Sequence, residues 1–168
     1  MADTVLVHPN RDKASSQTLR GIVFILLVVS AALILIVTLG GWEHLQGAQP
    51  ISFAWAAVYL VMAWQVARWN RGVLPVAAAL AILFAVIAAV AGPAWFERDK
   101  AGFDDPALDP AILGVLTVAM VPIQLALATF GMIAFQQQWH VEVEVTREEA
   151  DRYYSGGISG GQLTPVQS

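Results

Sequence analysis

The side chains of this sequence with the widest chemistry are its three histidines, His8, His44 and His140. An imidazole can ligate a metal or a haem iron, and it can move a proton near neutral pH. The three histidines lie far apart in the sequence, and each falls outside, or at the edge of, a long apolar segment. Isolated interfacial polar groups explain them better than a shared ligand set, so we expect no metal site and no cofactor.

The second candidate for chemistry is the acidic stretch ERDKAGFDDPALDP, residues 97–110, which contains Asp104, Asp105 and Asp109. Carboxylate oxygens bind Ca²⁺ and Mg²⁺, but these three aspartates lack the regular spacing of a calcium loop. A solvated acidic loop is the simpler interpretation, and a docking surface for a basic partner is the alternative. An enzyme built on this chain would have to use such a loop for its chemistry.

Other catalytic signatures are missing from the sequence. The chain has no cysteine, which excludes disulfides, thiolate metal sites and redox dithiols. It has no glycine-rich phosphate loop, no nucleophile elbow and no zinc-binding helix motif. The formal net charge of −4 argues against nucleic acid as a partner. We therefore expect no enzyme, no catalytic residue and no small-molecule substrate.

The composition is that of a membrane protein. Hydrophobic residues make up 57% of the chain and charged residues only 13%, whereas a soluble domain carries about 25% charged residues. A bilayer core about 30 Å thick needs about 20 apolar residues in a helix. Four segments meet this need, at about residues 21–42, 51–69, 73–96 and 111–138. The sequence thus predicts an all-α integral membrane protein with four transmembrane helices.

These spans divide the chain into three parts. Residues 1–20 are expected to form a polar N-terminal segment, in which SSQTLR, residues 15–20, caps and begins the first span. Residues 21–135 would form the four-helix transmembrane bundle. Residues 139–168 would form a short tail that carries a capped helix and a flexible, glycine-rich end.

The distribution of basic residues predicts the orientation in the cell membrane. With four spans, both termini and the loop between the second and third spans share one side, which holds seven basic residues: Arg11, Lys13, Arg20, Arg68, Arg71, Arg147 and Arg152. The other side holds only Arg98 and Lys100. The positive-inside rule then places both termini in the cytoplasm. Tryptophans at the span ends are expected to form interfacial belts: Trp42, Trp69, Trp95 and Trp139.

The apolar cores of the four segments contain no Asp, Glu, Lys, Arg or His. Ion-coupled transporters, proton relays and voltage sensors place such groups at membrane depth. The most conspicuous polar residue is Gln124, two positions after Pro122, where a kink is expected. We interpret Gln124 as a hydrogen-bonding group that joins the freed backbone or a neighbouring helix, and a transport role is the alternative.

Small residues predict where the helices approach one another closely. The third segment has an alanine at every fourth position, at Ala77, Ala81, Ala85 and Ala89, with Ala88 and Gly92 nearby. Such a seam is typical of an internal packing face, with a face for a partner subunit as the alternative. In the second segment, helical spacing places a set of large side chains on one face, for packing or lipid contact: Trp55, Tyr59, Met62 and Val66.

The tail begins with a strand-like alternation of valine and glutamate, VEVEV, residues 141–145. A single strand is not stable alone, so it needs a partner edge or stays extended. The following TREE has the pattern of a capping box, with Thr146 as N-cap and Glu149 at the third helical position.

A helix of about two turns through Tyr154 is expected after this cap, ending near Gly156. Tyr153 and Tyr154 would be its natural anchors. The tail as a whole suits a segment that is ordered by binding, and a disordered solubilising tail is the alternative.

The cysteine-free, charge-poor four-helix outline and the tail sequence EADRYYSGGISGG, residues 149–161, resemble the small accessory subunits of the actinobacterial respiratory supercomplex. This supercomplex joins cytochrome bcc to a haem-copper cytochrome oxidase. The resemblance covers the whole chain in outline. It implies a peripheral oxidase subunit without haem or copper, whose partners are larger membrane subunits of the oxidase complex and lipids.

Two functional hypotheses follow. The first is a non-catalytic, structural subunit of a respiratory membrane complex, which acts by helix packing and by a docking tail. The second is a stand-alone membrane protein of the cell envelope, either an assembly factor or a small-solute carrier.

Overall fold

Four long helices dominate the structure, a computed structural model that describes residues 4–45, 47–98 and 106–155. Its elements in chain order are β1 Thr4–Val7, α1 Pro9–Asp12, α2 Ala14–Gly40, the 3₁₀ turn η1 Trp42–His44, α3 Gln49–Ala67, α4 Val73–Phe96, α5 Pro110–Gln136, β2 Val143–Thr146 and α6 Arg147–Ser155. Helices α2 to α5 are each long and apolar enough to cross a membrane. The prediction of an all-α protein with four spans is confirmed.

Helix α2 begins earlier than hydropathy predicts. It starts at Ala14, its N-cap residue is Lys13, and no side chain caps it. The expected cap within residues 15–20 is therefore wrong, because Ser15 and Ser16 already lie in the first turn of the helix. The polar first turns of α2 extend the helix beyond its apolar stretch, and a hydropathy pattern does not register such an extension.

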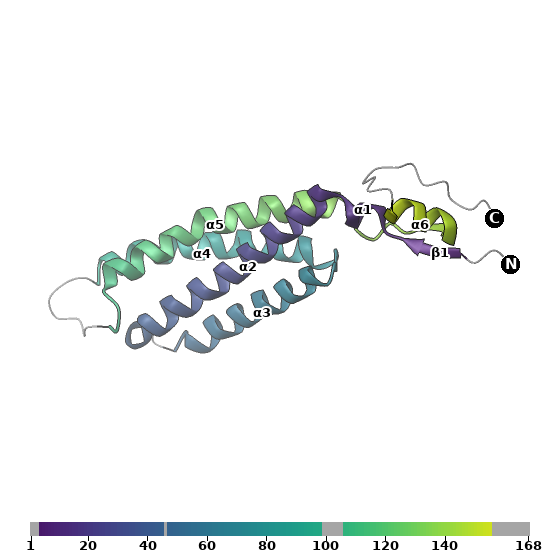
Figure 1. Cartoon of the computed structure of the whole chain (residues 1–168). Coiled ribbons are helices and arrows are strands. Elements are labelled where there is room, and N and C mark those ends of the chain that lie inside the picture. The colour runs from purple at the N-terminus through teal and green to yellow at the C-terminus, as the bar shows by residue number, and fades with distance from the viewer. Residues whose placement is uncertain (1–3, 46, 99–105, 156–168) are drawn as a thin grey trace.

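The bundle is elongated and has two layers, with α2 beside α3 and α4 beside α5 (Figure 1). Helix α4 packs most extensively on α5, and α2 contacts both α3 and α5. Helices α3 and α4 follow one another in the chain but make few contacts. An open cleft lies between α3 and α4.

The outward surface of the bundle is apolar, as contact with lipid requires. Large side chains on every long helix are more than half exposed, among them Ile25, Ile51, Val90 and Val115. A soluble protein seldom exposes a continuous apolar surface of this extent. The exposed side chains therefore support the membrane location that composition predicts.

The alanine seam of α4 is an internal packing face, but its course differs from the prediction. Ala77, Ala81 and Ala85 are buried, whereas Ala89 is exposed and Ala88 takes its place. A repeat of four residues drifts around a helix that has 3.6 residues per turn, so the buried line must shift by one position. Gly92 continues the shifted line, and a Cβ atom at this position would lie 2.6 Å from Cγ2 of Val118 on α5.

Gly92→Ala is expected to destabilise the bundle by about 1 kcal/mol, at the low end for overpacking because Val118 is 43% exposed and can shift. The matched control is Gly21→Ala on α2, where a Cβ atom meets nothing within 4 Å. That control should be neutral or slightly stabilising, because alanine favours the helix. Reversible unfolding in mixed micelles would measure both, and equal effects of the two changes would contradict the close α4–α5 contact.

The two termini of the chain pair with each other in an antiparallel two-stranded sheet. Val5 lies opposite Val145, and Val7 lies opposite Val143. Helix α6 covers the face that these valines share, and Val7, Val145 and Ala150 form a small buried core there. The strand predicted within residues 141–145 therefore has its partner edge in the N-terminal segment, where no strand was expected. The sheet and α6 lie beyond one end of the bundle (Figure 1), which we name the terminal end.

The tail, predicted to be ordered by binding, has its partner within the same chain. Residues 143–155 are ordered against the N-terminal strand of the same chain. Helix α6 begins directly after Thr146, as the capping pattern predicts, and ends at Ser155. The expected stop at Gly156 and the glycine-rich end of the tail lie outside the described residues.

Candidate functional site

A chain of hydrogen bonds crosses the middle of the bundle. The Tyr59 hydroxyl on α3 donates to Oε1 of Gln124 on α5 at 2.8 Å. Nε2 of Gln124 donates to Oγ of Ser30 on α2 at 2.9 Å, and this hydroxyl donates to the backbone carbonyl of Leu26 at 2.7 Å. All three side chains are fully buried. The prediction that Gln124 bonds a neighbouring helix is confirmed, and it joins two of them.

Four further hydroxyls of the long helices bond a carbonyl one turn earlier in the chain. Thr38 donates to the carbonyl of Ile34, and Thr117 donates to that of Leu113. Ser52 and Thr129 donate in the same way to the carbonyls four residues earlier. A hydroxyl that satisfies its helix in this manner is a structural group rather than a nucleophile.

Trp55 and Phe84 line an apolar cavity of about 290 Å³ that lies among α2, α3, α4 and α5, toward the end opposite the termini. Their rings lie 5.3 Å apart between centroids, and Tyr59 lies 6.2 Å from Phe84. The predicted common face of the second span is thus a packing face, since Tyr59, Met62 and Val66 are buried.

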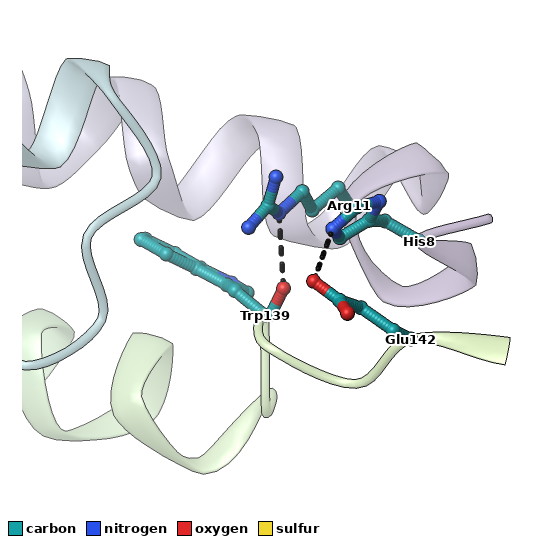
Figure 2. A network of polar contacts seen from close by, with 4 residues as sticks. All are labelled: His8, Arg11, Trp139 and Glu142. Carbon is teal, nitrogen blue, oxygen red and sulfur yellow. Dashed lines mark hydrogen bonds and ion pairs between the residues drawn. The ribbon is translucent and has the colours of Figure 1, made fainter. Parts of the chain in front are cut away.

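At the terminal end, Trp139 joins the bundle to the sheet. Its side chain is fully buried, and its ring lies edge-on to that of Trp69 at 5.2 Å. Nε of Arg11 donates to the Trp139 carbonyl at 3.0 Å, and the Arg20 guanidinium lies 4.3 Å from the centre of the Trp69 ring. Trp139 is therefore a core residue, as is Trp95 at the opposite end, and the predicted place of these two tryptophans in interfacial belts is wrong. Figure 2 shows the Arg11 contact beside the pair of His8 and Glu142.

The histidines lie at separate places. Nε2 of His8 lies 3.0 Å from Oε1 of Glu142 and links the two terminal segments (Figure 2). Nδ1 of His140 lies 3.0 Å from Nη1 of Arg71, and Nε of Arg71 donates to the Phe135 carbonyl at 2.7 Å. His44 lies at the opposite end of the bundle, near the Trp95 ring. Among the residues that the structure describes, no three His, Asp or Glu side chains form a metal-binding group.

Of the three candidate aspartates, Asp104 and Asp105 lie outside the described residues. Asp109 is the N-cap of α5, and its Oδ1 accepts a hydrogen bond from the backbone N–H of Ala111 at 2.7 Å. A carboxylate at this position satisfies the first turn of the helix and complements its dipole. Asp109 therefore has a structural role.

The two tyrosines of α6 differ in their surroundings. Tyr153 packs against the small core of the sheet, whereas Tyr154 is 61% exposed. Partial burial, and then the nearby carboxylate of Asp12, raise the pKa of Tyr153. Tyr153 thus anchors the tail to the chain itself, and the use of the two tyrosines as anchors for a binding partner stays a prediction.

The raised pKa of Tyr153 predicts a weak pH dependence of α6 packing. A group whose pKa is higher in the folded state stabilises that state below its ordinary value, which is about 10 for tyrosine. This contribution is lost as the pH rises through the folded-state pKa. We expect proteolysis within α6 to accelerate at alkaline pH, and Tyr153→Phe to remove part of that dependence. Tyr154→Phe is the control, and an equal effect of both changes would contradict the assignment.

Comparison of the chain with protein-family models, with curated proteins and with solved structures finds no match in any of the three.

Sequence reasoning missed three parts of this arrangement. The N-terminal TVLV strand, the buried position of Trp139 and the stacking of arginines on Trp69 have no motif of their own. The usable signal was the strand-like VEVEV, which required a partner edge somewhere in the chain.

Proposed function

We propose that this chain is a non-catalytic accessory subunit of a respiratory membrane complex. It would stabilise a cytochrome oxidase assembly by packing its helices against larger membrane subunits. The proposal includes the cytoplasmic location of both termini, which rests on the basic residues at the terminal end. The respiratory assignment rests on the resemblance in outline and tail sequence.

The observation that carries the structural role is the use of the polar groups at membrane depth. Ser30, Tyr59 and Gln124 bond one another near the middle of their helices. Polar residues in transporters instead line a pathway or bind an ion. Here they fix the positions of α2, α3 and α5 relative to one another, which suits a rigid packing module.

Helix α3 is the natural docking element. Only 28% of its most apolar stretch is buried inside the protein, against 39% for each of α2, α4 and α5. Its outward face carries large exposed side chains, including Phe53, Leu60 and Trp64. A partner helix packed on this face would give α3 the second neighbour that α4 does not provide.

The test is co-purification. A tag placed after Ser168 would be used to isolate the chain in mild detergent, and the visible spectrum and peptide content of the eluate would be recorded. Haem bands with oxidase and cytochrome bcc peptides in fixed ratio would support the proposal. Phe53→Ala with Leu60→Ala should then reduce the yield of these partners, whereas Val90→Ala with Val115→Ala, on α4 and α5, should not.

A colourless eluate that contains this chain alone would reject the respiratory assignment and favour a stand-alone envelope protein. The observation that favours this second candidate is the apolar cavity of about 290 Å³ beside Trp55 and Phe84. A cavity of this size is at the lower limit for binding a small apolar solute.

A further inference from the structure

Basic side chains without an acidic partner gather at the terminal end of the bundle. Within the described part of the chain, five of them form no ion pair with a carboxylate: Arg11, Lys13, Arg20, Arg68 and Arg71. Three of the five use donors inside the protein, since Arg11 and Arg71 bond backbone carbonyls and Lys13 bonds Asn10. Cations left at a membrane boundary attract anionic headgroups.

Arg20 and Arg68 are the two of these five whose side chains donate no hydrogen bond to another described residue. Arg20 lies over the Trp69 ring, and Arg68 lies over the Trp64 ring at 4.2 Å. A guanidinium stacked on a ring keeps its planar edge free, and that edge matches the geometry of a phosphate. Arg68 is exposed, so an anion can reach it from the membrane boundary.

The cleft between α3 and α4 forms an open groove of about 590 Å³, whose lining residues Gln65 and Asn70 flank Arg68 in the chain. Its walls toward the membrane interior are apolar, with Val58 and Val61 on α3 and Val76 on α4. Its terminal end is polar and is lined by Gln65, Asn70 and Gly72. The groove therefore has the two-part character of a phospholipid, apolar at depth and polar at the boundary.

Helical spacing connects Arg68 to the wall of the groove. Val61 and Gln65 line the groove, and Arg68, the C-cap residue of α3, follows Gln65 by three residues, about one turn closer to the terminal end. We propose that the groove holds an anionic phospholipid, with its phosphate at Arg68 and Gln65 and an acyl chain along Val61 and Val76. The free cation at the polar end selects an anionic headgroup over a zwitterionic one. This inference does not depend on which complex the chain joins.

The test is native mass spectrometry of the full chain from detergent micelles, with added phosphatidylglycerol or phosphatidylcholine. Phosphatidylglycerol should bind several-fold more tightly. Arg68→Gln should weaken its binding roughly fivefold, the size expected for one basic residue beside an anionic headgroup. Arg68→Lys keeps the charge and should retain most of the binding. The matched control is Arg98→Gln at the opposite end, where Arg98 lies 4.8 Å over the Trp95 ring.

A second pair of variants tests the acyl part of the site. Val61→Trp fills the groove and should weaken the binding of phosphatidylglycerol, whereas Leu60→Trp, on the outward face of α3, should not. Equal binding of the two lipids, equal effects of Arg68→Gln and Arg98→Gln, or no effect of Val61→Trp would overturn the proposal. So would full displacement of the lipid by millimolar inorganic phosphate, because the site would then bind a free anion.

Discussion

Trp139→Ala is expected to release the terminal sheet from the bundle. Truncating a fully buried tryptophan costs about 3–5 kcal/mol, from lost burial and the cavity left behind. Trp139 lies between the end of α5 and the start of β2, and its ring packs edge-on against Trp69. Arg11 bonds the backbone carbonyl of residue 139, so the alanine variant keeps that contact and loses only the contacts of the ring. The lost free energy should therefore mainly weaken the attachment of β1, β2 and α6 to the bundle, and it should destabilise the four long helices less.

Limited proteolysis under native conditions measures this release. When opening is fast relative to cleavage, the cleavage rate follows the population of the open form. An opening free energy lowered by about 3 kcal/mol corresponds to cleavage within residues 141–155 that is faster by roughly a hundredfold. Trp64→Ala is the control, because Trp64 is 55% exposed and contacts only Arg68 among the charged groups. Unchanged cleavage in Trp139→Ala would show that the sheet is held by other contacts.

The same junction explains where prediction from sequence fails. Trp69 and Gln138 follow the ends of α3 and α5 and adopt positive φ angles of 62° and 50°. Glycine usually occupies such positions, because a side chain costs about 1–2 kcal/mol in the left-handed region. Neither helix end therefore carries the glycine by which a sequence pattern would locate it. The tertiary contacts of Trp69 and Trp139 must offset the free-energy cost of these two backbone conformations.

The spans themselves are predictable because lipid imposes a simple rule on length and polarity. Gln124 is predictable as a bonding group because an amide in an apolar helix must find a partner. Its particular partners, Tyr59 and Ser30, depend on which helices are neighbours, and a single sequence does not contain that information. Likewise, the strand at Thr4–Val7 is short and acquires meaning only from its partner at Val143–Thr146, far away in the chain.

Gln124→Leu is expected to destabilise the bundle through the group that it leaves unpaired. The Tyr59 hydroxyl would lose its acceptor in a fully buried position, whereas Ser30 would keep its bond to the Leu26 carbonyl. An orphaned buried hydroxyl costs about 1–3 kcal/mol, and hydrogen bonds measured within membranes fall toward the lower part of this range. Equilibrium unfolding in mixed micelles with increasing dodecyl sulfate would measure the change.

The double variant separates this cause from a loss of packing. Gln124→Leu with Tyr59→Phe removes both partners, so no hydroxyl is left unpaired, and it should be more stable than Gln124→Leu alone. Thr129→Val, on the exposed side of α5, removes a hydroxyl that bonds only its own helix and should have little effect. If the double variant lost the sum of the two single effects, Gln124 and Tyr59 would be independent. The polar chain would then not be what fixes α3 against α5, and the interpretation of the bundle core as a rigid packing module would lose its main support.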